Sequence, residues 1–363
     1  MESIGIASSD PPIKINLILN CKKVYHLGVT THCMSGQCLT GFAERSVQNG
    51  VTDSAPSPTA TSRSIKPTLL FAKKICCLFF TCWIVTPLCA QLPVTQLYSL
   101  HYKENQDKQY SYSDLNYLSS FNSKGYNNQP YIIKENQFFA TIYVEESKQT
   151  DIFLFDLDLK EYRNLTRSQD SEYSPRLHPT LSESFTTVKV PTSDSNSQWL
   201  TLQNLNSGLT QKVLLDEQGK IGYYRWIKDK TWVCFLVDEH HKMAVCTEGS
   251  LSKLIFAEDV GRSFEVFNEE IYFVHKTKDA NLLKKYNIRS SKSEILALMP
   301  TGSEDFCIKP NGDLICSHQN RFLRLNEAKE WTEFLNLPKE WFHNIQRFSI
   351  SDGQIVFVEL QNP

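Results

Sequence analysis

Residues 171–190 read SEYSPRLHPTLSESFTTVKV, a polar, turn-rich phrase followed by a short strand pattern. Similar phrases open five further units: GYNNQP at 125–130, GYYRWI at 222–227, GRSFEV at 261–266, GSEDFCIKP at 302–310 and NIQRFSI at 344–350. With Pro130, Pro175, Arg225, Phe264, Asp305 and Arg347 as markers, the spacings are 45, 50, 39, 41 and 42 residues. A repeat of about 40–50 residues that contains four short strands is typical of a β-propeller blade. Six openings therefore predict an all-β chain with six blades.

Short β-rich segments separated by polar turns follow each opening, as in FFATIYV at 138–144 and DIFLFDL at 151–157. The spacing of a long amphipathic helix is absent. Only IVFVEL at 355–360 follows the sixth opening, so the last blade is short of strands. We expect the N-terminal strand at 94–102 (VTQLYSLHY) to complete it, because ring closure removes a free sheet edge. An irregular β-sandwich is the alternative, but it does not explain the near-constant spacing.

These repeats resemble those of the TolB-like six-bladed propellers, a WD40-like group. SEYSPRLHPTLSESFTTVKV is similar to the TolB-type repeat, in which Ser-Pro, a Pro-Asp-Gly-like turn and an apolar strand follow one another. The segments KPNGDLIC at 309–316 and ISDGQIVFVEL at 350–360 carry the same turn, and TDIFLFDLDLKEYRNLT at 150–166 resembles the first blade of exported Bacteroidetes-type members. The resemblance covers about residues 94–360. It implies four-stranded antiparallel blades and protein–protein interaction in the cell envelope.

The N-terminal quarter has a different character. Residues 1–65 include VTDSAPSPTATSR at 51–63, and we expect them to be disordered or a spurious extension ahead of a natural start near Leu69 or Leu70. In residues 66–90, Lys73 and Lys74 precede an apolar run at 75–85 and a small residue stands at the end, the pattern of a signal peptide. The run is too short for a membrane span. We therefore expect cleavage near Ala90 and a periplasmic or secreted propeller at 91–363. A lipid anchor on Cys89 fits the sequence less well.

Charge and cysteine content limit the partners. Lys and Arg number 38 against 40 Asp and Glu, and no basic block stands out, which argues against nucleic acid. We expect a monomer whose partner is an envelope protein or a small polar ligand. Cys234 and Cys246 share one predicted hairpin, and Cys307 and Cys316 share another. Free thiols are favoured because a bridge across neighbouring strands requires specific geometry, although the sequence leaves their state open.

The polar blade openings supply the candidate binding residues. Innermost strands of a propeller begin near one mouth of the central channel, so we expect seven side chains to approach one another there. They are Asn128, Glu172, Tyr173, Tyr223, Arg262, Glu304 and Asp305. Arg262 would form an ion-pair network with the three carboxylates or bind a polar ligand. The alternative is that these residues cap strands and hold the blades in register.

No catalytic residue, metal ligand or cofactor site is predicted. The sequence has no Gly-x-Ser-x-Gly elbow, no His-Glu-x-x-His and no phosphate-binding glycine-rich loop ahead of a helix. A non-catalytic scaffold for protein interaction or ligand binding is therefore the favoured function. A propeller enzyme of the metal-dependent lactonase or lyase type is the alternative, since Glu172, Glu304 and Asp305 could contribute to such a site. Recognition of a glycan or peptide at the same mouth is a third.

Overall fold

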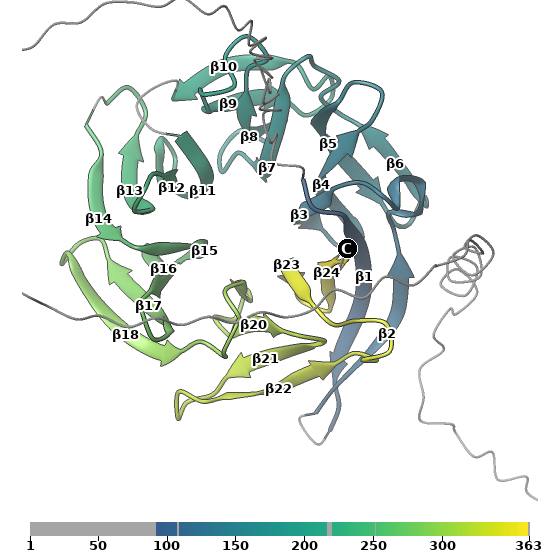
Figure 1. Ribbon diagram of the computed structural model, residues 1–363, viewed down its shortest axis with the longest axis vertical. Helices are drawn as coiled ribbons and strands as arrows, with labels where there is room; N and C mark the ends of the chain where they lie inside the picture. Colours follow the sequence, from purple (N-terminus) through teal and green to yellow (C-terminus); the bar gives the residue numbers. More distant parts are fainter. Residues whose placement is uncertain (1–91, 107–108, 216–219, 251, 362–363) are drawn as a thin grey trace, which may run out of the picture. The chain divides into compact units, whose positions relative to one another are not determined.

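Six four-stranded antiparallel sheets stand as blades around a central channel in the computed structural model (Figure 1). The structure describes residues 92–106, 109–215, 220–250 and 252–361. The predicted extension at 1–65 and signal peptide at 66–90, with Cys89 and Ala90, lie outside the described residues. Within those residues, no helix is long and apolar enough to cross a membrane. The predicted all-β, six-bladed propeller is confirmed.

We letter the blades A to F around the ring and give the strands of each from the innermost outward. Blade A contains β23 (Ile345–Ser351), β24 (Gln354–Leu360), β1 (Thr95–Glu104) and β2 (Tyr110–Tyr117). Blade B contains β3 (Asn127–Lys134), β4 (Gln137–Val144), β5 (Gln149–Asp156) and β6 (Glu161–Asn164). Blade C contains β7 (Ser171–Leu177), β8 (Ser184–Val190), β9 (Trp199–Asn204) and β10 (Thr210–Leu215).

The other three blades follow the chain in the same way. Blade D contains β11 (Lys220–Lys228), β12 (Thr231–Val237), β13 (Lys242–Thr247) and β14 (Leu254–Glu258). Blade E contains β15 (Val260–Phe267), β16 (Glu270–Lys276), β17 (Asn281–Asn287) and β18 (Lys292–Leu298). Blade F contains β19 (Phe306–Ile308), β20 (Leu314–His318), β21 (Arg321–Leu325) and β22 (Trp331–Asn336). A 3-10 turn at Ser120–Asn122 joins blades A and B.

Blade A joins the two ends of the propeller. Strand β1 pairs antiparallel with β24 from Thr95–Leu360 to His101–Gln354, and Leu97 and Leu100 of β1 are fully buried. The predicted closure by the N-terminal strand is therefore confirmed. The structure adds β2, which pairs with β1 and forms the outer edge of the blade. The ring thus closes through main-chain hydrogen bonds, which cover the edge that β24 would otherwise leave free.

The hydrophobic core is divided among the seams between neighbouring blades. Among the described residues, six apolar clusters form, and each joins two adjacent blades. Because the middle strands pack against a blade on both faces, they read as continuous apolar runs, such as QIVFVEL in β24. The B–C seam has the smallest set of buried apolar side chains, Phe139, Ile152, Leu165 and Phe185. Polar side chains fill the rest of that seam.

The innermost strands carry β-bulges that aim side chains into the channel. Gln129, Ser174 and Arg347 have φ values of 54°, 54° and 36°, and each lies at a register shift of its strand. A bulge locally turns the strand and redirects a side chain. All three residues line one cavity of the channel. These irregularities build the surface that a ligand would meet.

Candidate binding site in the central channel

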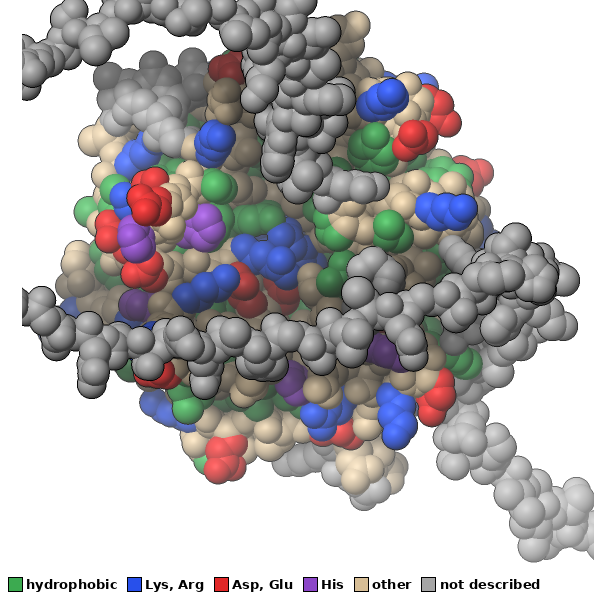
Figure 2. All heavy atoms as spheres, viewed as in Figure 1, with side chains coloured by type: hydrophobic (Ala, Val, Ile, Leu, Met, Phe, Trp, Pro, Cys, Tyr) green, Lys and Arg blue, Asp and Glu red, His purple; other side chains and the backbone are tan. Residues whose placement is uncertain are grey.

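Four of the seven predicted residues meet where the innermost strands begin. We call this opening the first mouth; it is a cavity of about 470 Å³ lined by Tyr126, Tyr173, Tyr223, Arg262, Glu304, Arg347 and neighbouring side chains. Asp305 lies beside it and lines a cavity together with Arg262. On the face drawn in Figure 2, basic and acidic side chains gather at the centre of the ring. The six-fold repeat therefore brings five of the seven residues together from blades C, D, E and F.

Arg262 contacts both carboxylates of blade F but forms an ion pair with only one of them, Asp305. The Arg262 guanidinium donates to both oxygens of Asp305, with Nη2–Oδ2 at 2.7 Å and Nε–Oδ1 at 3.3 Å. Glu304 accepts a hydrogen bond from the Arg262 backbone N–H and pairs with Lys276 at 3.0 Å. Burial alone would raise the pKa of Asp305, but the charge and hydrogen bonds of Arg262, together with Arg347, outweigh burial and lower the pKa. Asp305 therefore stays ionised in the channel.

Gly261 allows this close approach of Glu304 to the backbone of β15. A Cβ atom at position 261 would lie 2.7 Å from Oε1 of Glu304. Real Cβ atoms do not come so close to an oxygen, so a larger residue would displace the carboxylate. The glycine that opens the GRSFEV phrase thus has a role in the site as well as in the repeat.

Glu172 and Asn128 do not reach the channel network. Glu172 is fully buried in the B–C seam, where it faces Lys189 across the β7–β8 pair with Oε1–Nζ at 3.2 Å. The expected link between Glu172 and Arg262 is therefore wrong. Asn128 is also buried, and its side-chain oxygen accepts a hydrogen bond from the Gln129 N–H at 2.8 Å. Consecutive strand residues point to opposite faces, so Tyr173 reaches the mouth while Glu172 points into the seam.

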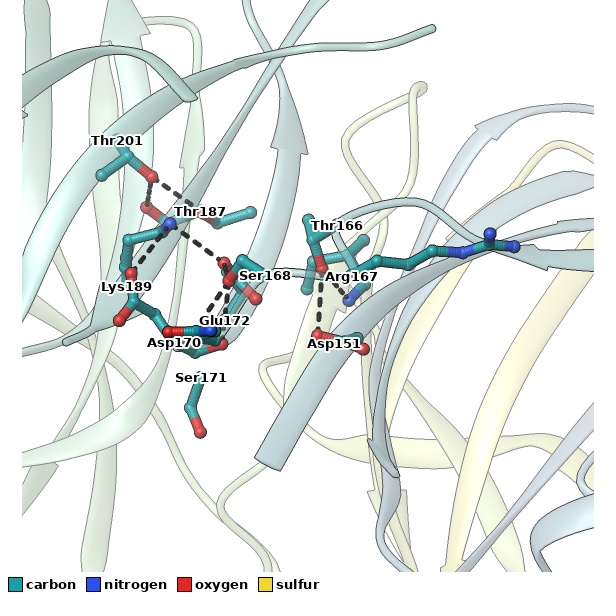
Figure 3. A network of polar contacts seen from close by, with 12 residues as sticks. Asp151, Thr166, Arg167, Ser168, Asp170, Ser171, Glu172, Thr187, Lys189 and Thr201 are labelled. Carbon is teal, nitrogen blue, oxygen red and sulfur yellow. Dashed lines mark hydrogen bonds and ion pairs between the residues drawn. The ribbon is translucent and has the colours of Figure 1, made fainter. Parts of the chain in front are cut away.

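We call Asp151, Asp170, Glu172 and Lys189 the seam cluster; Figure 3 shows these side chains with the hydroxyl groups around them. Lys189 also pairs with Asp170 at 3.2 Å, and Ser168 donates to Glu172. Among the described residues, the second carboxylate oxygen of Glu172 has no hydrogen-bond partner. Burial raises the pKa of Glu172 to about 7, although Ser168 and Lys189 act in the other direction. Glu172 therefore titrates near neutral pH.

The sequence prediction missed several charged residues of the channel. Arg225 pairs with Glu265 through two hydrogen bonds, Nε–Oε2 at 2.9 Å and Nη2–Oε1 at 3.0 Å, which joins blade D to blade E. Arg347 of blade A reaches across the ring to the Tyr223 hydroxyl of blade D, and its guanidinium lies 4.6 Å from the Tyr223 ring centre. Arg225 and Arg347 were themselves markers of the repeat. Their equivalent positions were a signal that both side chains would face the channel.

The channel offers groups that bind and orient polar ligands. Guanidinium groups and phenol hydroxyls can donate hydrogen bonds to an acidic or polar partner. Within the part of the chain that the structure describes, no group of three or more His, Cys, Asp or Glu side chains could hold a metal ion.

The structure also gives the state of four cysteines of the propeller. As the sequence favoured, the free and buried thiols are those of Cys234, Cys246, Cys307 and Cys316.

No family model and no curated protein matches this sequence. Solved structures do resemble it. Putative TolB from Agrobacterium tumefaciens has a TM-score of 0.55 at 8% identity over 75% of this chain and 99% of that chain. TolB from Acinetobacter baumannii has a TM-score of 0.47 at 13% identity, and the match covers 74% of this chain but only 64% of that one. Oligogalacturonate lyase from Vibrio parahaemolyticus scores 0.44 at 14% identity over 72% and 83% of the two chains. At these identities the likeness extends to the fold alone: this chain is a six-bladed propeller structurally similar to TolB-type propellers.

Proposed function

We propose that this protein is a non-catalytic binding scaffold of the cell envelope and that it holds its partner at the first mouth. The observation that carries the proposal is the composition of that mouth, where three tyrosines and two arginines line one cavity of about 470 Å³. Tyrosine and arginine are the side chains that most often dominate binding energy at protein interfaces. The ring holds four of them on paired strands and Tyr126 directly before β3, so little conformational entropy is lost on binding.

Export rests on the sequence. The predicted signal peptide at 66–90 supports a periplasmic or secreted location, and the resemblance to TolB-like propellers supports an envelope protein as partner. A small polar ligand is the other candidate for the same mouth.

The metal-dependent enzyme alternative has less support from the geometry. It requires Glu172, Glu304 and Asp305 to converge on one site. Glu172 lies in the seam cluster, and Asp305 is paired with Arg262. Glu304 is held between Lys276 and the β15 backbone. These three carboxylates therefore do not form one ligand set.

The test is affinity capture from envelope extract with charge-reversed variants of the full chain. Lys276→Glu changes the first mouth at a side chain that is 45% exposed, so folding should tolerate it. Lys292→Glu is the matched control, because it makes the same reversal on the exposed outer strand β18 of the same blade. We expect one partner to be captured by wild type and control, and about fivefold less by Lys276→Glu, because the reversed charge disrupts the complementary field at the mouth. A partner captured equally by all three, or no partner, would exclude the first mouth as the binding site.

A further inference from the structure

A second cavity lies in the channel next to the first mouth, with which it shares Gln129, Tyr223, Arg262 and Arg347. It has a volume of about 50 Å³ and is lined by four arginines that come from four different blades. The charged residues of this cavity, which we call the channel cluster, are Arg176, Arg225, Arg262, Arg347, Glu265 and Asp305. Four guanidinium groups therefore face two carboxylates.

Both carboxylates are already occupied. Glu265 accepts two hydrogen bonds from Arg225, and Asp305 accepts two from Arg262. Such two-point contacts use the favoured geometry of a guanidinium with a carboxylate. The two acidic groups of the cavity thus neutralise two of the four arginines.

Arg176 and Arg347 take part in none of the ion pairs found among the described residues. Arg176 donates one hydrogen bond to the Pro175 carbonyl at 3.1 Å and lies 4.5 Å from the Tyr131 ring centre. Arg347 has the Tyr223 hydroxyl and ring as its neutral partners. A guanidinium has five N–H donors, so most donors of both groups are left for solvent or a ligand.

The local electrostatics differ between the two arginines. At Arg347, burial lowers the pKa, but Tyr223, Tyr126 and Asp305 together raise it. Burial, together with the positive charge of Arg225, lowers the pKa of Arg176 to about 10. Arginine nevertheless stays protonated at neutral pH, so its charge cannot be relieved by losing a proton. Arg176 is partly exposed, so solvent and the charge of Glu265 compensate it in part, and an anion from outside the chain would add to this compensation.

We infer that the second cavity is a binding site for a small oxyanion, a carboxylate or phosphate group, held by Arg176 and Arg347. Gln129 and Ser174 line the same cavity and add neutral polar atoms. The volume is several times that required for one water molecule, which fits an oxyanion but not a bulky ligand. The inference rests on the proposed function in one respect: the ligand that enters through the first mouth would carry this acidic group.

Calorimetry and thermal unfolding of the purified full chain test the inference without any partner. Inorganic phosphate and succinate are added separately in Tris-chloride, with sodium chloride at equal ionic strength as the reference. We expect at least one of the two to release or absorb heat at a stoichiometry of one and to raise Tm, because a ligand that binds only the folded state stabilises it. The two arms distinguish a phosphate site from a carboxylate site.

Arg176→Gln and Arg347→Gln identify the residues that hold the anion. We expect each to weaken binding about tenfold or more, since a charge-assisted hydrogen bond is lost. Arg163→Gln, on the exposed strand β6, is the matched control and should bind as wild type does. The inference is overturned if phosphate and succinate both act as chloride does, or if binding is unchanged in both channel variants. Failure here leaves the capture experiment at Lys276 unaffected, so the two proposals can fail separately.

Discussion

The seam cluster and the channel cluster are both polar groups in a propeller, yet their charges are unbalanced in opposite directions. In the seam, Asp170 and Glu172 pair with one lysine, Lys189, and the negative charge of Asp151 also acts on Glu172. In the channel, four guanidinium groups face two carboxylates. An excess of carboxylates can be relieved by binding a proton, and burial raises the pKa of Glu172 to about 7, which favours this. An excess of guanidinium groups cannot be relieved by losing protons, because arginine stays protonated at neutral pH. The first imbalance is therefore compatible with a structural role, while the second indicates a ligand.

The largest expected effect tests the structural role of the seam cluster. Among the residues that the structure describes, Lys189→Met removes the one cation paired with fully buried Glu172. We expect the free energy of unfolding at pH 8 to fall by about 4 kcal/mol, because removing one partner leaves a buried charge without compensation. Urea unfolding measures the change, and the loss should be smaller at pH 5, where Glu172 is protonated.

Lys212→Met is the matched control for this substitution. Lys212 lies on the exposed strand β10 and pairs with Glu248. The Lys212 side chain is 57% exposed. Exposed ion pairs contribute little, so this variant should unfold almost as wild type does. Equal losses in the two variants would mean that the seam pair is not buried from solvent in the folded protein.

The next effect is the pH dependence of stability. Because the pKa of Glu172 rises from 4.5 to about 7 on folding, the folded protein keeps a proton between these values that the unfolded chain has lost. Stability from this group is therefore complete below pH 4.5, falls as the pH rises to 7, and stays low above it. The total change is at most about 3 kcal/mol.

Glu172→Gln should flatten this part of the pH profile in urea unfolding between pH 5 and pH 8. Burial also raises the pKa of Glu359 to about 6, so part of the slope below pH 6 should remain in the variant. If the profiles of wild type and Glu172→Gln run parallel from pH 5 to pH 8, Glu172 keeps an ordinary pKa and the seam does not relieve its charge by protonation.

The fold was largely predictable because each repeat has a polar opening followed by short β-rich segments. Polar openings at spacings of 39–50 residues gave six blades, and the short last unit gave the closure through β1. The second N-terminal strand, β2, was missed. Its sequence, YSYSDLNY, alternates tyrosines with polar residues at an outer edge, and only the register of β1 fixes its place.

The sequence predicted which strand segments reach the candidate site, but not which of two consecutive residues faces the channel. The period placed Tyr173 and Glu172 together at the mouth, but alternation sends one to the channel and the other to the seam. The bulges at Gln129, Ser174 and Arg347 then shift the alternation by one position. A bulge depends on the neighbouring strands of the ring, so the sequence of a single blade does not reveal it.

The smallest expected effect separates paired from unpaired arginines inside the channel. Arg225→Gln leaves Glu265 without its guanidinium partner, and we expect the free energy of unfolding to fall by about 2 kcal/mol. This loss is smaller than for a fully buried pair, because both side chains are about a fifth exposed. Arg176→Gln leaves no carboxylate behind and removes the repulsion from Arg225, at the expense of its contact with Tyr131. The free energy of unfolding in Tris-chloride should then change by less than about 1 kcal/mol. If Arg176→Gln instead destabilises as strongly as Arg225→Gln, Arg176 holds the blades together within the chain, and the argument that its charge is available to an external anion no longer holds.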